Sequence, residues 1–419
     1  MKPESKNSVR LIAEKASSAS RALAACSSPE RTEFILGMAD GVEGAAEEIL
    51  KGNAVDVAKA EGVGQKAAII DRLRLDRERL NGIIAAMRHV ASLPDPVGKL
   101  LEEKIRPNGL RILKERVPIG VIGIVYEARP NVTADSAVLC VRSGNAVILR
   151  GGTDAFATNT ALARAIIRGG EARGLPAGAV SFIENPDRGQ ILELVRLEGV
   201  VDLVIPRGGE ALVRAVTEGA TVPVLKHYKG VCHTFVDASA DLEMATRICE
   251  NAKCQRPGVC NAMETLLVHK DIAPAFLQLL GPVLTKAGVE LRGDEVAVKH
   301  LPGAKAATEN DWYEEYLDLI LAVRVVVDVN EAVAHINKYG SRHSDTIVAA
   351  DPVAQDIFSS GVDSAVVYVN ASTRFTDGGE FGLGAEIGIS TDKLHARGPM
   401  GLEELTTYRY LVLGEGQVR

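Results

Sequence analysis

The chain has 419 residues, which at about 150 residues per domain predicts two or three domains and excludes a small scaffold held by disulfides or a structural metal. Apolar residues make up 46% of the sequence and charged residues 25%, which excludes wholesale disorder. The 48 basic and 55 acidic side chains leave a net charge of −7, which gives no electrostatic reason to bind nucleic acid or an anionic membrane.

The N-terminal residues 1–7 are polar and no apolar core of a signal peptide follows them, so we expect no export. The longest apolar stretch, residues 117–126, is too short to span a bilayer. The cysteines form no C-x-x-C pair and have no histidine pair nearby, so we expect cytoplasmic thiols and no metal site. They are Cys26, Cys140, Cys232, Cys249, Cys254 and Cys260.

The first hundred residues predict helices. Apolar side chains at helical spacing between Leu80 and Val90 predict one buried helix face, and the prolines at 94 and 96 end that helix. Ser28, followed directly by Pro29, predicts the N-cap of an earlier helix.

From residue 118 onward, short apolar runs alternate with helical patterns, which predicts parallel sheets covered on both faces. In the first such unit we expect strands at 121–126, 146–149, 180–183 and 201–205, and helices at 132–142, 155–173, 189–197 and 210–218. After residue 231 a second unit has expected strands at 232–236, 265–269, 346–349 and 365–369, and helices at 242–253, 273–287 and 331–338. Two further strands, 109–117 and 406–413, lie outside this alternation.

Gly208 and Gly209 follow an expected strand and open a helix, where backbone N–H groups could meet a pyrophosphate. On its own this pattern is weak, and a tight strand-to-helix turn is the preferred interpretation of it. No complete G-x-G-x-x-G motif occurs in such a context.

Cys260 lies on a Pro-Gly bend between a helix and a strand, where a thiol can be exposed to a cleft and activated as a thiolate. The alternative is a small apolar filler. Cys140 and Cys249 fall inside helical patterns and are interpreted as fillers. Asn131 opens a helix at the carboxyl end of a buried strand, where ligands of α/β sheets bind; it is either an N-cap or a side-chain amide for an oxyanion.

Five segments, 117–131, 255–262, 335–345, 381–391 and 394–399, resemble the aldehyde dehydrogenase superfamily, in the form of its gamma-glutamyl phosphate reductase (glutamate-5-semialdehyde dehydrogenase) family. The resemblance extends from about residue 8 to the C-terminus. One departure is Cys254, where relatives have threonine; it places a second thiol six residues from Cys260. A reversible disulfide between the two is one hypothesis, and an apolar filler at 254 is the preferred one.

The resemblance implies that Cys260 is the nucleophile, which attacks the acyl phosphate of L-glutamyl 5-phosphate, expels phosphate and forms a thioester. NADPH then delivers a hydride, and glutamate 5-semialdehyde leaves, as a step of proline biosynthesis. The amide of Asn131 and the N–H of Cys260 match the superfamily's oxyanion hole. Hydrolytic relatives carry a water-activating glutamate in a segment that here is 227–231 and holds no carboxylate, which favours reduction over the alternative, an oxidative NAD(P)-dependent aldehyde dehydrogenase.

For the cofactor, the resemblance implies that Gly208 and Gly209 approach the pyrophosphate and that Glu315 holds the nicotinamide ribose. Arg150 ends an expected strand near the adenine ribose, and is interpreted either as a ligand of the NADPH 2′-phosphate or as a solvated strand-end arginine.

For the substrate oxyanions the candidates are Arg129, Arg256 and Arg374, with surface salt bridges as the alternative. The run 343–345 (His-Ser-Asp) cannot form a hydrolase triad, because adjacent positions alternate in direction, and is interpreted as a strand entry.

The implied fold is α/β and aldehyde-dehydrogenase-like, with a Rossmann-type cofactor domain (1–104 and 118–232), a catalytic domain (233–385) and a small projecting oligomerisation sheet (105–117 and 400–419). We therefore expect a homo-oligomer. Glutamate 5-kinase is raised as a partner, because its acyl phosphate product is labile. A non-catalytic binding protein that kept the fold is the remaining alternative, against which Cys260, Asn131 and Glu315 argue.

Overall fold

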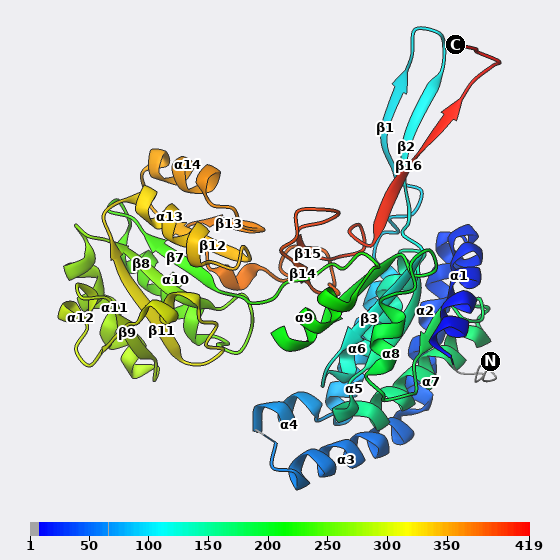
Figure 1. Ribbon diagram of the computed structural model, residues 1–419, viewed down its shortest axis with the longest axis horizontal. Coiled ribbons are helices and arrows are strands. Elements are labelled where there is room, and N and C mark those ends of the chain that lie inside the picture. Colours follow the sequence, from blue (N-terminus) through cyan, green and yellow to red (C-terminus); the bar gives the residue numbers. More distant parts are fainter. Residues whose placement is uncertain (1–7, 66) are drawn as a thin grey trace. The chain divides into compact units, whose positions relative to one another are not determined.

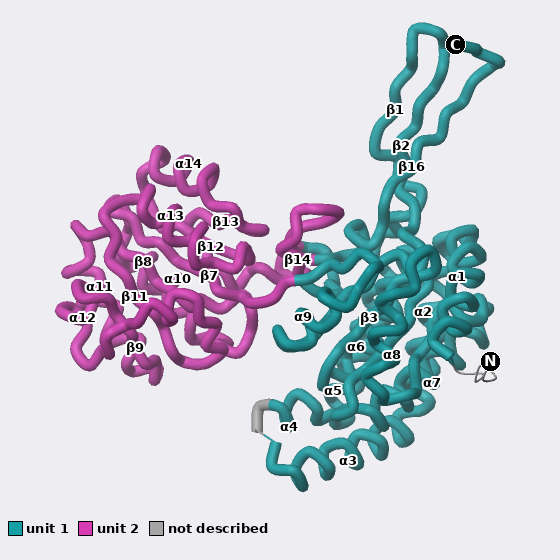
Figure 2. Tube along the Cα trace, in the orientation of Figure 1, with its two compact units in different colours: residues 1–226, 382–388, 400–419 teal, residues 227–381, 389–399 magenta. Residues whose placement is uncertain are grey.

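The computed structural model describes residues 8–65 and 67–419 and divides into two compact units, shown in different colours in Figure 2. Residues 1–7, on which the expectation of no export rests, lie outside the described part. Unit 1 consists of Met1–Lys226, Gly382–Gly388 and Met400–Arg419, and unit 2 of His227–Phe381 and Ile389–Pro399. No helix in the described part of the chain is long and apolar enough to cross a membrane.

Unit 1 begins with five helices: α1 (Val9–Ala25), α2 (Ser28–Gly44), α3 (Ala46–Gly62), α4 (Ala67–Leu73) and α5 (Arg77–Ser92). The predicted apolar face of α5 is buried along its whole length. The predicted cap of α2 was wrong by one residue: the N-cap is Ser27, whose side chain accepts from the Glu30 N–H while Glu30 accepts from the Ser27 N–H. This reciprocal pair outcompetes Ser28 because it satisfies two backbone donors at once.

The sheet of unit 1 has four parallel strands in the order β5-β4-β3-β6. Every residue of the central strands β3 and β4 is buried, as predicted for strands covered on both faces. The strands are β3 (Val121–Tyr126), β4 (Ala146–Gly151), β5 (Val180–Phe182) and β6 (Leu203–Arg207); the connecting helices are α6 (Pro130–Arg142), η1 (Thr153–Ala155), α7 (Phe156–Ala172), α8 (Gly189–Leu194) and α9 (Glu210–Gly219).

Unit 2 contains a seven-stranded parallel sheet in the order β10-β9-β11-β8-β7-β12-β13. Its strands are β7 (Cys232–Val236), β8 (Met263–His269), β9 (Glu290–Gly293), β10 (Lys305–Ala306), β11 (Ile320–Val326), β12 (Ser344–Val348) and β13 (Val366–Val369). Its helices are α10 (Leu242–Cys254), α11 (Ala273–Lys286), α12 (Ala297–His300), η2 (Glu309–Tyr313), α13 (Val329–Tyr339), α14 (Pro352–Gly361) and η3 (Thr373–Phe375). The unit also contains a short antiparallel pair of strands, β14 (Ile389–Ser390) and β15 (Gly398–Pro399).

Three strands of the seven-stranded sheet of unit 2 were not predicted, and neither was the pair β14 and β15. β9 and β10 are too short to form a pattern, and the apolar run of β11 does not by itself distinguish a buried strand from a helix.

An antiparallel sheet of three strands, β1 (Leu100–Ile105), β2 (Arg111–Pro118) and β16 (Thr406–Leu413), projects from the rest of unit 1 (Figure 1). The predicted strand 406–413 is confirmed, and 109–117 corresponds to β2. Strand β1 was not predicted, because its charged residues interrupt any apolar pattern and all six of its residues are exposed. We call this three-stranded sheet the arm.

Candidate functional site

The turn between β3 and α6 places Asn131 at the carboxyl end of a buried strand, as predicted. The N-cap interpretation is wrong, because the N-cap of α6 is Arg129 and Asn131 already lies inside the helix. Its side-chain Nδ2 instead donates to Asp135 Oδ2, one turn later, at 3.0 Å. Ala128, just before this turn, has φ +31°, a left-handed conformation that is strained for a residue with a Cβ. The turn is thus held in an unusual shape that presents the Asn131 amide.

Asp135, the partner of Asn131, carries a strongly shifted carboxyl. Burial raises its pKa to about 6, while the hydrogen bond from Asn131 and the positive charge of Arg207 act in the opposite direction. The protonation state of this carboxyl therefore changes just below neutral pH, one hydrogen bond away from a predicted catalytic amide.

Gly208 and Gly209 form the turn from β6 into α9, as predicted. The Gly209 N–H donates to Glu127 Oε2 at 2.9 Å, so a carboxylate of the chain itself meets the start of α9. A Cβ on Gly208 would lie 2.5 Å from the same oxygen, so any other residue there would displace the Glu127 side chain. Glu127 was not singled out in the sequence, since nothing local indicates that its side chain reaches residue 209.

Arg150, the candidate for the cofactor 2′-phosphate, is not the solvated strand-end arginine of the alternative interpretation. It is buried, and its guanidinium donates to the carbonyl oxygens of Gly151 at 2.6 Å and Pro186 at 2.7 Å. Burial, and next the positive charge of Arg188, lower the pKa of Arg150. Two arginines therefore lie close together, Arg150 near the carboxyl end of β4 and Arg188 after β5, and Arg188 is exposed.

In unit 2, Cys260 lies half-buried on the predicted bend between α10 and β8. Gly230 packs directly against its backbone: a Cβ at Gly230 would lie 1.9 Å from the Cys260 carbonyl oxygen. The Gly230 N–H in turn donates to Glu315 Oε1 at 2.8 Å. Gly230 therefore contacts two predicted site residues, Cys260 and Glu315, although it was not itself predicted to belong to the site.

One further side chain, that of Cys232, lies next to the Cys260 backbone and is itself close to a histidine. The buried thiol of Cys232 donates to the Cys260 carbonyl oxygen, with Sγ and O 3.2 Å apart, and lies 3.7 Å from Nδ1 of the buried His343. Burial is the largest cause that raises the pKa of Cys232 well above its ordinary value. Gly230, Cys260 and His343 directly precede or lie just before β7, β8 and β12, three neighbouring strands, so the site lies at the amino edge of this sheet.

The interpretation of 343–345 as a strand entry is confirmed, since β12 begins at Ser344. His343 Nδ1 is 2.9 Å from Ser344 Oγ, but Asp345 pairs with His233 at 2.9 Å instead, so no triad forms.

Of the three candidate substrate arginines, Arg129 belongs to unit 1, and Arg256 and Arg374 to unit 2. Arg374 donates through Nε to Gln255 Oε1 at 3.1 Å and through Nη1 to Asn261 Oδ1, the side chain next to Cys260. Burial is the first cause that lowers the pKa of Arg374, and the positive charge of Arg256 is the second. Arg256, Arg374 and Cys260 therefore form one cluster.

Cys254 ends α10 and is half-buried; all six cysteines are free thiols in the structure. Its role stays a prediction. Within the described residues, no group of three or more histidine, cysteine, aspartate or glutamate side chains could hold a metal ion.

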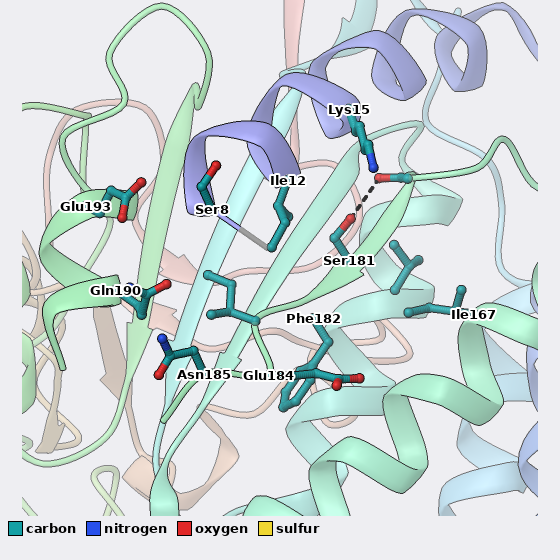
Figure 3. Close-up of a pocket in the computed structure, with 13 residues that line it drawn as sticks. Ser8, Ile12, Lys15, Ile167, Ser181, Phe182, Glu184, Asn185, Gln190 and Glu193 are labelled. Atoms are coloured by element: carbon teal, nitrogen blue, oxygen red, sulfur yellow. Dashed lines mark hydrogen bonds between the residues drawn. The ribbon is translucent and has the colours of Figure 1, made fainter. Parts of the chain in front are cut away.

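A cavity of about 740 Å³ lies along β5, the edge strand of the unit 1 sheet, and is lined by residues of α1, β5 and α8 (Figure 3). Lys15 and Glu193 flank it, and none of the predicted site residues contributes to its lining.

Comparisons with known proteins bear on these arrangements. The model of the aldehyde dehydrogenase family matches residues 2–299 of the chain. A gamma-glutamyl phosphate reductase of Caldanaerobacter subterraneus subsp. tengcongensis is 54% identical over 411 residues, which cover 98% of this chain and 99% of that protein. The crystal structure of gamma-glutamyl phosphate reductase from Thermotoga maritima is similar with a TM-score of 0.96 at 48% identity, covering 98% of this chain and 99% of that chain. That from Saccharomyces cerevisiae is 30% identical with a TM-score of 0.55, covering 98% of both chains.

Proposed function

Because the chain belongs to the gamma-glutamyl phosphate reductase family of the aldehyde dehydrogenase superfamily, we propose that it reduces L-glutamyl 5-phosphate to L-glutamate 5-semialdehyde in proline biosynthesis. The observation that carries the proposal is the setting of Cys260. This cysteine lies on a bend whose backbone is packed against Gly230 and hydrogen-bonded by Cys232, with Arg256 and Arg374 beside it. A nucleophilic thiol held beside cations suits an anionic acyl substrate.

In the proposed reaction the Cys260 thiolate attacks the carbonyl carbon of the acyl phosphate. The bond from that carbon to the phosphate oxygen breaks, inorganic phosphate leaves, and a thioester remains on the enzyme. Hydride addition to the thioester carbonyl and loss of the thiolate then release the aldehyde. Sulfur suits both steps, because it is a good nucleophile and a good leaving group.

Each step passes through an oxyanion, for which we assign the side-chain amide of Asn131 and the N–H of Cys260. The amide nitrogen of Asn131 carries two N–H groups, and only one of them is needed for Asp135. Hydrogen bonding to Asp135 also limits the orientations that the amide adopts. Such preorganised donors stabilise a transition state by about 3–4 kcal/mol each.

The proposed cofactor is NADPH, which supplies the hydride when bound. The chain has residues that fit it: a turn at Gly208, where a Cβ would displace the Glu127 side chain, and two nearby cations, Arg150 near the end of β4 and Arg188 after β5. Gly208 and Gly209 would lie along the pyrophosphate, the two arginines would bind the 2′-phosphate, and Glu315 would hold the nicotinamide ribose.

The substrate oxyanions are assigned to Arg129, Arg256 and Arg374. Reduction is favoured over hydrolysis of the thioester because segment 227–231 has no carboxylate to activate water. Hydrolysis would moreover destroy the intermediate that a reductase needs.

We further propose a cytoplasmic homo-oligomer that pairs through the arm. The free cysteines fit a reducing compartment. Strands β1 and β16 are the two edges of the arm and are almost wholly exposed, with apolar side chains such as Ile105, Tyr410 and Val412 in contact with solvent. Docking of glutamate 5-kinase, to receive the labile acyl phosphate directly, remains part of this proposal.

The test is NADP reduction by the full-length protein with glutamate 5-semialdehyde, with and without inorganic phosphate. The proposed enzyme requires phosphate or arsenate for this reverse reaction. A rate that is independent of both would instead identify the alternative, an oxidative NAD(P)-dependent aldehyde dehydrogenase.

A further inference from the structure

A small cavity of about 210 Å³ lies in unit 2 between the end of α10 and the segment that follows η3. Its lining is almost entirely polar: Asn251 and Gln255 come from the α10 side, and Arg374, Phe375, Asp377 and Glu380 from the other. The mechanism proposed above uses only Arg374 among these six residues.

Arg374 is fixed at the edge of this cavity by the residue that follows the nucleophile. Its guanidinium donates to Asn261 Oδ1 and to Gln255 Oε1. Asn261 is itself clamped to the same segment, since its Nδ2 donates to the Thr376 carbonyl oxygen at 2.9 Å and its own carbonyl accepts from Thr373 Oγ1 at 2.7 Å. The position of Arg374 relative to the Cys260 backbone is therefore set by four hydrogen bonds within this unit.

The charges of the lining have both signs. Arg374 supplies a guanidinium, whereas Asp377 and Glu380 supply carboxylates, and both carboxylates are exposed. Asp377 is also constrained, because its Oδ1 accepts from the Gly379 N–H at 2.9 Å. A simple anion would be repelled by the two carboxylates and a simple cation by the guanidinium. A ligand that carries a carboxylate and an ammonium on one carbon satisfies both.

We propose that this cavity binds the α-amino-acid head group of the substrate, with Arg374 on the α-carboxylate and Asp377 and Glu380 on the α-ammonium. This inference rests on the proposed function, which places the γ-carbonyl carbon of a glutamyl group at Cys260. Three carbon–carbon bonds separate that carbon from the α-carbon, so the head group must be recognised close to the nucleophile. The cavity selects a γ-activated amino acid over an ordinary aldehyde, and it leaves Arg256 for the phosphate.

Three aldehydes separate the contributions in the phosphate-dependent reaction: glutamate 5-semialdehyde, 5-oxopentanoate, which lacks the ammonium, and pentanal, which lacks both head groups. For Asp377→Asn we expect kcat/KM with glutamate 5-semialdehyde to fall about ten- to hundredfold, as for loss of a charged hydrogen bond, and kcat/KM with 5-oxopentanoate to stay unchanged. For Arg374→Gln we expect kcat/KM to fall more for glutamate 5-semialdehyde and 5-oxopentanoate, which both carry the carboxylate, than for pentanal. Glu250→Gln is the matched control, an acid on α10 that does not line the cavity.

Calorimetric titration of the full-length protein with L-glutamate gives a readout that does not depend on turnover. Binding should weaken in Asp377→Asn and stay unchanged in Glu250→Gln. If Asp377→Asn matches the wild type with all three aldehydes and with L-glutamate, the head-group assignment is wrong even though the proposed function stands. If the wild type shows no phosphate-dependent activity, the proposed function fails, and the titration alone decides whether the cavity binds amino acids.

Discussion

The buried thiol of Cys232 donates a hydrogen bond to the main-chain carbonyl oxygen of Cys260, so a second cysteine restrains the backbone of the proposed nucleophile. A side chain on a neighbouring strand thus restrains the bend on which Cys260 lies. Cys232 does not take part as a nucleophile, because burial raises its pKa far above the physiological range.

Cys232→Ala should lower kcat several-fold, because the carbonyl of Cys260 loses its donor, with a loss of about 1–3 kcal/mol in the free energy of unfolding. Cys232→Ser keeps a hydroxyl donor and should recover most of the rate. Steady-state kinetics and denaturant unfolding of both variants check this. Equal rates for the alanine and serine variants would show that the hydrogen bond has no positioning role.

Cys260→Ser should abolish turnover while NADPH binding and the melting temperature stay near those of the wild type, because only the nucleophile is changed. Cys254→Ser is the matched control, six residues away on the end of α10, and should retain near-wild-type activity. A Cys260→Ser enzyme within about tenfold of the wild type would rule out the thioester mechanism.

Asn131→Ala should lower kcat by roughly 10²–10³, as for removal of one oxyanion donor. Since Asn131 is not the N-cap of α6, the melting temperature should change little. Measuring both quantities on the same variant separates the roles. A clear loss of stability at unchanged kcat would contradict the assignment.

Asp135→Asn should change the dependence of stability on pH. The folded pKa of about 6 lies above the ordinary aspartate value, so the wild type loses stability as the pH rises from about 4 to about 6. The variant cannot ionise at this position and should lack that decline. Its stability relative to the wild type should therefore increase across this pH interval. Melting temperatures measured from pH 4 to pH 8 check this, and parallel curves would refute it.

Arg188→Ala should weaken the binding of NADPH about tenfold or more and leave the binding of NADH almost unaffected, because only NADPH carries the 2′-phosphate. The melting temperature should not change, because Arg188 is exposed. Arg150→Ala should likewise weaken NADPH more than NADH, and it should also lower the melting temperature, because this buried guanidinium holds the carbonyls of Gly151 and Pro186. Fluorescence titration with both cofactors separates the two effects. Equal losses for NADPH and NADH in both variants would argue against a 2′-phosphate site.

Much of the fold could be predicted from the sequence, because the central strands and amphipathic helices carry strong local patterns. Strand β3 occupies the predicted residues, since a strand buried on both faces is apolar throughout. Strand β1 could not be predicted, since an exposed arm strand has no buried face to impose a pattern. The cap of α2 was misplaced because two adjacent serines compete and only the distance to Glu30 decides between them.

Only those parts of the candidate site that depend on a local sequence pattern, such as Cys260 and Asn131, could be predicted. Its supporting contacts join residues distant in the chain: Gly230 to Glu315, and Cys232 to Cys260. Such pairs depend on strand order, which the sequence pattern does not supply. Cys260 lies at the amino ends of the strands, whereas ligands of α/β sheets generally bind at the carboxyl ends, so this general rule does not predict its location.

The close approach of Gly230 to Cys260 has a consequence for how this enzyme could change during evolution. Any side chain at position 230 would overlap the Cys260 carbonyl oxygen, so even alanine there should displace the backbone of the proposed nucleophile. A carboxylate that activates water therefore cannot be acquired at this position by one substitution. A descendant of this protein that hydrolysed the proposed thioester would need its water-activating base at another residue. A change from reductase to hydrolytic dehydrogenase therefore cannot begin with a substitution of Gly230.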